Sequence, residues 1–307
     1  MKNILKIFGI IVLVIFLLLV GVYLFLYYVV NYAPMVPKNY VSEIETGGDI
    51  EAKYLAIGKY EVSFLEEKSD DEAIKKYEVW YPQELQSKNK KYPVVVVVNG
   101  TGVFATKSKP LFEHLASWGF IVIGNEDPST WNGKTADKTL KFLLNENENK
   151  ESIFYGKVDI NNIGITGHSQ GGVGVFNAIT INEHSSFYKC AVSLSPTEEE
   201  MAELLKIPYD SSKTTIPMFM LAGTDNDVIS LEKMKDMYDR MNEFKVMARK
   251  SGQGHGQMLY SADGYVTAWF MWHLKGNMEA AKAFVGENPE ILNNQLYEDQ
   301  NIGSNIR

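Results

Sequence analysis

The chain has 307 residues, of which 45% are apolar and 22% are charged, so its composition is that of a folded globular protein and excludes a largely disordered one. Its net charge of −8 argues against nucleic acid as a partner. The single cysteine, Cys190, excludes an internal disulfide and a metal site built on cysteines. Cys190 lies in the pattern YKCAVSLS, which predicts a buried strand, so we interpret it as a core residue rather than a catalytic thiol.

The first thirty residues indicate a membrane segment. Lys2 and Lys6 precede an uncharged apolar run, and about 20 apolar residues are enough to span a bilayer. A cleaved signal peptide, the alternative, would need a shorter apolar region and small residues at a cleavage site. Because the lysines favour a cytoplasmic N-terminus, we expect residues 1–6 in the cytoplasm and a transmembrane signal anchor at 7–30. The rest of the chain would then be extracytoplasmic, held at the cell membrane or released if the anchor is cut.

The segments after the anchor predict a linker followed by three strands. Residues 31–49 hold two prolines and a Gly-Gly pair, which is typical of a linker. Residues 59–67 and 75–85 alternate apolar and polar side chains, which predicts two exposed antiparallel strands. Five consecutive valines in YPVVVVVNGTG, residues 92–102, predict a central strand that is buried on both faces.

Helix and strand patterns alternate in the remainder of the chain. Helices are predicted over residues 107–119, 135–149, 171–182, 230–242 and 264–276, and strands over 120–127, 162–169, 189–196, 215–224 and 244–252. Repeated βαβ units predict an α/β domain with a doubly wound, mostly parallel sheet, which we place at residues 50–295. The polar residues 296–307 are expected to form a tail that frays.

A Gly-x-Ser-x-Gly motif occurs in GITGHSQGG, residues 164–172, with Ser169 at its centre. The motif alone is weak, but here it follows a strand pattern and precedes a helix pattern. Such a sharp turn lifts a serine hydroxyl above the sheet edge at a helix N-terminus, and a Cβ at Gly167 or Gly171 would clash there. We therefore interpret Ser169 as a nucleophile rather than as a helix cap.

A serine nucleophile needs a base, and this kind of turn requires the chain order Ser, then Asp or Glu, then His. Three histidines follow Ser169. His184 comes before any strand-end carboxylate, and His273 lies among tryptophans in a helix pattern. His255 lies in the glycine-rich loop GQGHGQM directly after a strand pattern, so His255 is the predicted base.

The carboxylate and the oxyanion donors follow from the same architecture. Asp225 and Asp227 both end a buried strand pattern in LAGTDNDVIS, and spacing alone does not choose between them. One oxyanion donor should be the backbone N–H of the residue after the nucleophile, Gln170. The other should come from the loop after the central strand, where Thr101 in NGTG is the natural candidate.

Taken together, these motifs resemble the α/β-hydrolase superfamily, and within it the bacterial cutinase and polyester-hydrolase (PET hydrolase) group, near the dienelactone hydrolases. The resemblance extends from about residue 60 to about residue 290 and rests on motifs in the family's order: YPVVVVVNGTG, LASWGFIVIGNED, INNIGITGHSQGG, AVSLSPT, LAGTDNDVIS, GQGHGQM and YVTAWFMWHLKG. It implies a Ser169, Asp227, His255 triad, an oxyanion hole on Thr101 and Gln170, and no cofactor or metal. Dienelactone hydrolases normally carry cysteine where this chain has Ser169.

Two positions depart from the polyester hydrolases. These enzymes usually carry an aromatic residue at the position of Thr101 and a tryptophan near that of Thr197, and the aromatics clamp aromatic or long acyl substrates. We therefore expect a membrane-anchored serine carboxylic-ester hydrolase that acts on a small-molecule or surface-bound ester. The absence of these aromatic residues argues against cutin or an aromatic polyester as its substrate. A peptidase or acyltransferase with the same triad, or a catalytically silent scaffold protein, are the alternatives.

Overall fold

The computed structural model describes residues 2–303, and the chain divides into two units that meet between Met35 and Val36. The first unit is helix α1 (Lys2–Asn31). Residues 6–31 of this helix include an 18-residue window with a mean hydropathy of 3.2, and they are long and apolar enough to cross a membrane. Because length and composition suit a signal anchor and a signal peptide alike, the helix is compatible with both.

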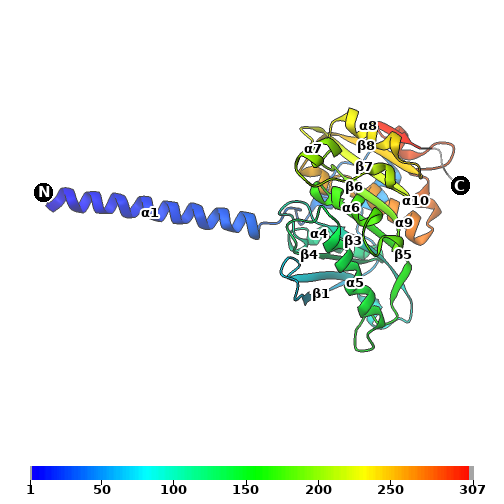
Figure 1. Cartoon of the computed structure of the whole chain (residues 1–307), viewed down its shortest axis with the longest axis horizontal. Coiled ribbons are helices and arrows are strands. Elements are labelled where there is room, and N and C mark those ends of the chain that lie inside the picture. Colours follow the sequence, from blue (N-terminus) through cyan, green and yellow to red (C-terminus); the bar gives the residue numbers. More distant parts are fainter. Residues whose placement is uncertain (1, 304–307) are drawn as a thin grey trace. The chain divides into compact units, whose positions relative to one another are not determined.

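The second unit is built on one sheet (Figure 1). Within residues 36–303 this sheet has nine strands in the order β1-β2-β4-β3-β5-β6-β7-β8-β9. The six strands from β4 to β8 in this order pair in parallel. Antiparallel pairing adds β1 and β2 at one edge and β9 at the other. The strands are β1 (Val62–Lys68), β2 (Lys76–Pro82), β3 (Tyr92–Val98), β4 (Ile121–Asn125), β5 (Val158–His168), β6 (Tyr188–Leu194), β7 (Met218–Asp225), β8 (Lys245–Gly254) and β9 (Tyr297–Ile302).

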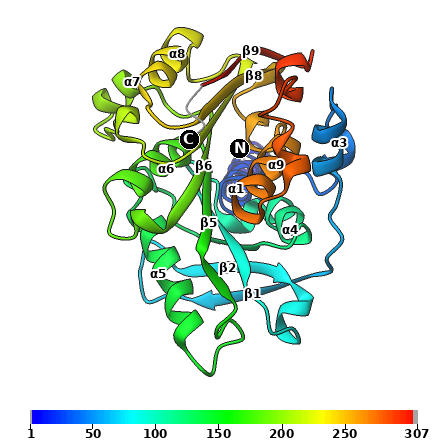
Figure 2. The same cartoon turned by 90° about the vertical axis from the view of Figure 1, so that its right-hand side faces the viewer.

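Helices cover both faces of this sheet (Figure 2). One face packs against α4 (Lys109–Ser117) and α9 (Asp263–Lys275), and the other against α5 (Lys134–Glu148), α6 (Gln170–Thr180) and α8 (Leu231–Arg240). The short elements are α2 (Tyr40–Glu43), α3 (Asp49–Leu55), α7 (Glu199–Leu204), α10 (Met278–Ala281) and 3₁₀ turns at Gln83–Gln86, Ala105–Lys107, Ser185–Phe187, Ser211–Lys213, Gln257–Leu259 and Glu290–Asn293. The predicted α/β class with a doubly wound, mostly parallel sheet is confirmed.

The run of five valines forms the central strand β3, as its composition predicts. Val94, Val96 and Val98 are buried in the apolar cluster that includes α5 and α6. Val95 is buried in the opposite cluster, with α4 and α9. Successive side chains of a strand point to opposite faces, so an uninterrupted valine run fills both cores and places the end of β3 in the middle of the sheet.

The segment expected to be a linker packs against the domain from Val36 onward. Val36 and Tyr40 are buried. The Tyr40 hydroxyl donates to Asp263 Oδ2 at 2.5 Å, and that carboxylate oxygen lies 2.7 Å from Nδ1 of the buried His114. The sequence does not predict these contacts, because the partners lie far away in the chain. The local pattern of residues 31–49 shows only the prolines and glycines that are typical of a linker.

Two further segments differ from expectation at the sheet edges. Strand β2 is buried along almost its whole length, because its side chains pack into the apolar clusters on both faces of the sheet, Val79 and Tyr81 into one and Trp80 into the other. Within the predicted tail, Tyr297–Ile302 form β9 and pair with β8 instead of fraying. Of this polar strand only Tyr297 is buried, so its sequence lacks the alternation that predicts a strand. The last four residues of the predicted tail lie outside the described residues.

Candidate active site

Ser169 occupies a sharp turn between β5 and α6, as predicted. Its φ of 59° and ψ of −123° are unusual for a residue with a side chain, and such strain persists only where the surroundings impose it. A Cβ on Gly167 would lie 2.4 Å from the carbonyl oxygen of Gly171, and a Cβ on Gly171 would lie 2.2 Å from that of Val98. Glycine is therefore required on both sides of Ser169 for the helix to start this close to β3.

Three side chains that lie far apart in the sequence meet at this turn. Ser169 Oγ lies 3.0 Å from His255 Nε2, and His255 Nδ1 lies 3.1 Å from Asp227 Oδ1. The Asp227 side chain is 3% exposed and that of His255 is 27% exposed, so solvent reaches the imidazole but hardly the carboxylate. These distances are those of a serine, a base and an orienting acid in hydrogen-bonding contact.

The structure also distinguishes the two candidate carboxylates. Asp225 is exposed at the end of β7, where its backbone pairs with β8. Asn226 then adopts a φ of 48°, and the chain turns so that Asp227 points back into the site. Spacing alone did not separate these two residues, whereas the turn at Asn226 brings only Asp227 within reach of His255.

The Asp227 carboxylate is held by four donors. Besides His255, they are the Ser195 hydroxyl and the Gly223 N–H, both 2.6 Å from Oδ2, and the Val228 N–H, 2.7 Å from Oδ1. Burial alone would raise the pKa of Asp227. The hydrogen bonds from His255, Ser195 and the backbone outweigh burial and hold the pKa below its usual value, so the group stays ionised beside the imidazole.

His168 holds the backbone of the loop that carries His255, a contact that the sequence did not predict. Its Nε2 lies 2.7 Å from the carbonyl oxygen of His255, and the two rings are 4.6 Å apart. A carbonyl oxygen only accepts, so Nε2 carries the proton. Burial, and next the nearby His255, lower the pKa of His168 to about 4, so it stays neutral. As the variable residue of Gly-x-Ser-x-Gly, His168 gives no signal of this contact in the sequence.

The two predicted oxyanion donors, Gln170 and Thr101, belong to segments that border Ser169. Gln170 is the first residue of α6, where backbone N–H groups have no partner within the helix. Its side chain turns away and accepts from the Thr130 N–H at 3.1 Å. Thr101 is exposed and follows Gly100, on which a Cβ would lie 3.6 Å from Ser169 Cβ. The loop that carries Thr101 therefore packs directly against the serine.

The other residues weighed in the sequence have structural contacts. The His184 N–H and Nδ1 both bond the Asp137 carboxylate, at 2.8 and 3.0 Å. With Glu183 these two form a group within residues 2–303 whose ligand atoms lie within 4.8 Å of one another, yet both Asp137 oxygens already serve His184. His273 packs against tryptophans, and burial lowers its pKa to about 3. Burial raises the pKa of the Cys190 thiol, which suits a core residue.

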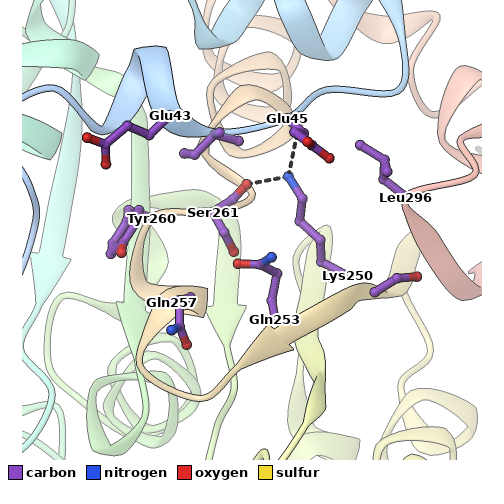
Figure 3. Close-up of a pocket in the computed structure, with 10 residues that line it drawn as sticks. Glu43, Glu45, Lys250, Gln253, Gln257, Tyr260, Ser261 and Leu296 are labelled. Atoms are coloured by element: carbon purple, nitrogen blue, oxygen red, sulfur yellow. Dashed lines mark hydrogen bonds between the residues drawn. The ribbon is translucent and has the colours of Figure 1, made fainter.

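A cavity of about 310 Å³ lies beside the loop that holds His255 (Figure 3). Gln253 and Gln257 line it from that loop, and residues 43–45 line it from the N-terminal segment of the domain. Lys250 Nζ donates to the carbonyl oxygens of Ser261, at 2.6 Å, and Glu45, at 3.1 Å, and it pairs with the buried Glu51 at 3.2 Å. Lys250 thus ties both ends of the loop to the N-terminal segment.

Comparison with known proteins confirms the expected resemblance. No curated protein matches the chain. A family model described as PET hydrolase-like (PETase) matches residues 56–280, which is most of the domain and includes Ser169, Asp227 and His255. A family of this description points to a hydrolase that acts on esters. The chain therefore belongs to the PET hydrolase-like family of the α/β-hydrolase superfamily.

Proposed function

We propose that the chain is a serine carboxylic-ester hydrolase that works through Ser169, His255 and Asp227. The main support is the continuous contact from Ser169 Oγ through the imidazole to Asp227, at 3.0 and 3.1 Å. An ionised carboxylate only accepts, so the proton of a neutral His255 sits on Nδ1 and leaves Nε2 free to take the serine proton. Family membership supports an ester as the substrate.

The reaction takes place in two steps. Ser169 Oγ attacks the ester carbonyl carbon while His255 Nε2 takes its proton, and Asp227 stabilises the imidazolium. The tetrahedral intermediate collapses, the bond to the alcohol oxygen breaks, and the alcohol leaves with the proton from His255. Water then attacks the acyl-enzyme with His255 as base, which releases the acid and restores Ser169.

The oxyanion of both intermediates would be bound by the backbone N–H groups of Gln170 and Thr101. The position of Gln170 at the start of α6 supports this role, because the helix dipole adds positive potential there. The close packing of Gly100 against Ser169 supports it for Thr101. These donors act only when the carbonyl becomes an oxyanion, so they lower the barrier rather than tighten substrate binding.

For the substrate we propose a small or flexible ester rather than an aromatic polymer. Thr101 is exposed and Thr197 is half-buried, and neither offers a ring to stack on a substrate. Between β6 and β7 the chain forms only α7 and one 3₁₀ turn, Ser211–Lys213, which is too little to build a bulky lid. An open site with small residues at its rim favours soluble or surface-bound esters.

We further propose that α1 is an uncleaved signal anchor that keeps the catalytic domain on the extracytoplasmic side of the cell membrane. Its hydropathy and the position of Lys2 and Lys6 support this topology. The full chain should sediment with membranes and resist extraction at alkaline pH, and residues 33–307 expressed alone should not. A soluble product that has lost its first thirty residues would instead identify a cleaved signal peptide.

Ser169→Ala tests the proposed function. Hydrolysis of p-nitrophenyl acetate should fall by at least about 10⁴-fold, because the remaining residues cannot form the acyl-enzyme. Wild type should react covalently with a fluorophosphonate probe and the variant should not. Retention of a few per cent of the wild-type rate would reject Ser169 as the nucleophile, and a wild-type protein that neither labels nor hydrolyses esters would be a silent scaffold.

A further inference from the structure

Ser195 lies at the end of β6, between the two groups that flank the imidazole. The Ser169 N–H donates to the carbonyl oxygen of Leu194 at 2.8 Å, which fastens the sharp turn to β6. The Ser195 N–H donates to the carbonyl oxygen of Leu221 in β7 at 2.7 Å, and the Ser195 hydroxyl donates to Asp227 Oδ2 at 2.6 Å. Leu194 and Ser195 therefore connect the backbone of Ser169 to Asp227 by a path that does not pass through His255.

The backbone of Ser195 is held in an unfavourable conformation. Ser195 is fully buried and has a φ of 43°, in the left-handed region that residues with a Cβ rarely adopt. Glycine would fit this backbone with less strain. Serine differs from glycine here by its hydroxyl, which donates a hydrogen bond to Asp227. A strained backbone conformation persists only where neighbouring contacts impose it, and such residues are common at functional sites.

The donors around Asp227 show what the hydroxyl does. Oδ1 accepts from His255 and from the Val228 N–H, and Oδ2 accepts from Ser195 and from the Gly223 N–H. Of the three donors other than the imidazole, only Ser195 contributes a side chain. Without its hydroxyl, Oδ2 keeps a single donor, and the carboxylate can rotate away from the plane in which Oδ1 meets His255.

We propose that Ser195 is a positioning residue, whose hydroxyl fixes the Asp227 carboxylate in the orientation that aligns His255 with Ser169. This inference rests on the proposed function of those three residues. Ser195 acts only through Asp227. Its loss should therefore affect the rate of the chemical step and leave substrate binding unchanged.

Two variants remove the hydroxyl in different backbone settings. Ser195→Ala keeps the strain at φ 43°, and Ser195→Gly relieves it. In both, kcat for p-nitrophenyl acetate should fall by about 10- to 100-fold with KM within about twofold, because a catalytic group has lost its alignment. In an Asp227→Asn background the same substitutions should change little.

Ser193→Ala is the matched control. Ser193 lies two residues earlier, in β6, and is as fully buried as Ser195. Its hydroxyl donates to the carbonyl oxygen of Gly172 at 3.2 Å and not to Asp227. This variant should keep the wild-type kcat and KM. Wild-type behaviour of both Ser195 variants, or an equal loss in Ser193→Ala, overturns the proposal. Ser169→Ala in the same assay tells failure of the proposed function from failure of the positioning role. An active Ser169→Ala would overturn the assignment of Ser169 as the nucleophile as well. An inactive Ser169→Ala beside a fully active Ser195→Ala would overturn the positioning role of Ser195 alone.

Discussion

Gly171→Ala tests how tightly the turn around Ser169 is built. An added Cβ would lie 2.2 Å from the carbonyl oxygen of Val98 and 2.7 Å from that of Asn99, and both are backbone atoms at the end of the central strand. Contacts under 3.0 Å essentially never occur for real Cβ atoms. Because backbone atoms cannot rotate away, the start of α6 would have to move from β3 by roughly 1 Å.

This displacement should reduce both stability and activity. We expect Gly171→Ala to lower the free energy of unfolding by about 3 kcal/mol, at the upper end for an overpacked site. Replacing glycine by alanine in a helix contributes about 1 kcal/mol at most in the other direction, so it does not offset the clash. Ser169 lies two residues earlier and would move with the helix start, so kcat should fall about 100-fold.

Gly172→Ala is the matched control for this prediction. It lies in the same helical turn and is also buried, but the atom nearest to its added Cβ is Ser193 Oγ, at 2.8 Å, which can rotate away. The nearest backbone atoms, Leu194 O and Pro196 Cα, would lie at 3.2 Å, so they need to shift by only a few tenths of an ångström. We expect a loss of about 1 kcal/mol or less and nearly wild-type kcat. Urea unfolding followed by tryptophan fluorescence gives the free energies, and initial rates with p-nitrophenyl acetate give kcat. Wild-type stability and kcat in Gly171→Ala would refute the tight packing argued here.

Two more predictions concern the carboxylate and the buried histidine. Asp227→Asn should lower kcat by about 10⁴-fold, because an amide cannot stabilise the imidazolium, while Asp225→Asn should stay within about twofold; equal losses in steady-state assays would contradict the assignment of Asp227. His168 has a pKa of about 4 in the fold and about 6.5 when unfolded, so the unfolded state binds more protons between these values and the free energy of unfolding falls as the pH decreases through that range. From pH 7 to pH 4.5 this residue should account for a loss of about 2 kcal/mol that His168→Gln avoids. Parallel pH slopes for both proteins in urea unfolding would show that the His168 proton is not involved.

The parts of the fold that rest on local chemistry could be predicted from the sequence. The five valines of β3 identify a strand buried on both faces, and the glycines around Ser169 identify a turn in which a Cβ does not fit. Neighbouring residues impose both features, so the pattern and the structure coincide. The edges of the domain could not be predicted in this way, because Tyr40 and β9 are held by partners more than 40 residues away.

The sequence alone determined the residue types of the candidate site and their order along the chain. A serine in a strand–turn–helix requires a later acid and then a histidine. Residue spacing left Asp225 and Asp227 open and the family resemblance implied Asp227, while the tertiary structure shows that Asp227 contacts His255. Only the tertiary structure revealed the contacts of Ser195 and His168. Each of these depends on where backbone turns such as Asn226 at φ 48° direct a side chain, and on groups from β6, β7 and β8 that meet at one sheet edge. A hydrogen bond requires its donor and acceptor to be placed to within a few tenths of an ångström. The spacing of residues along the chain does not specify such distances.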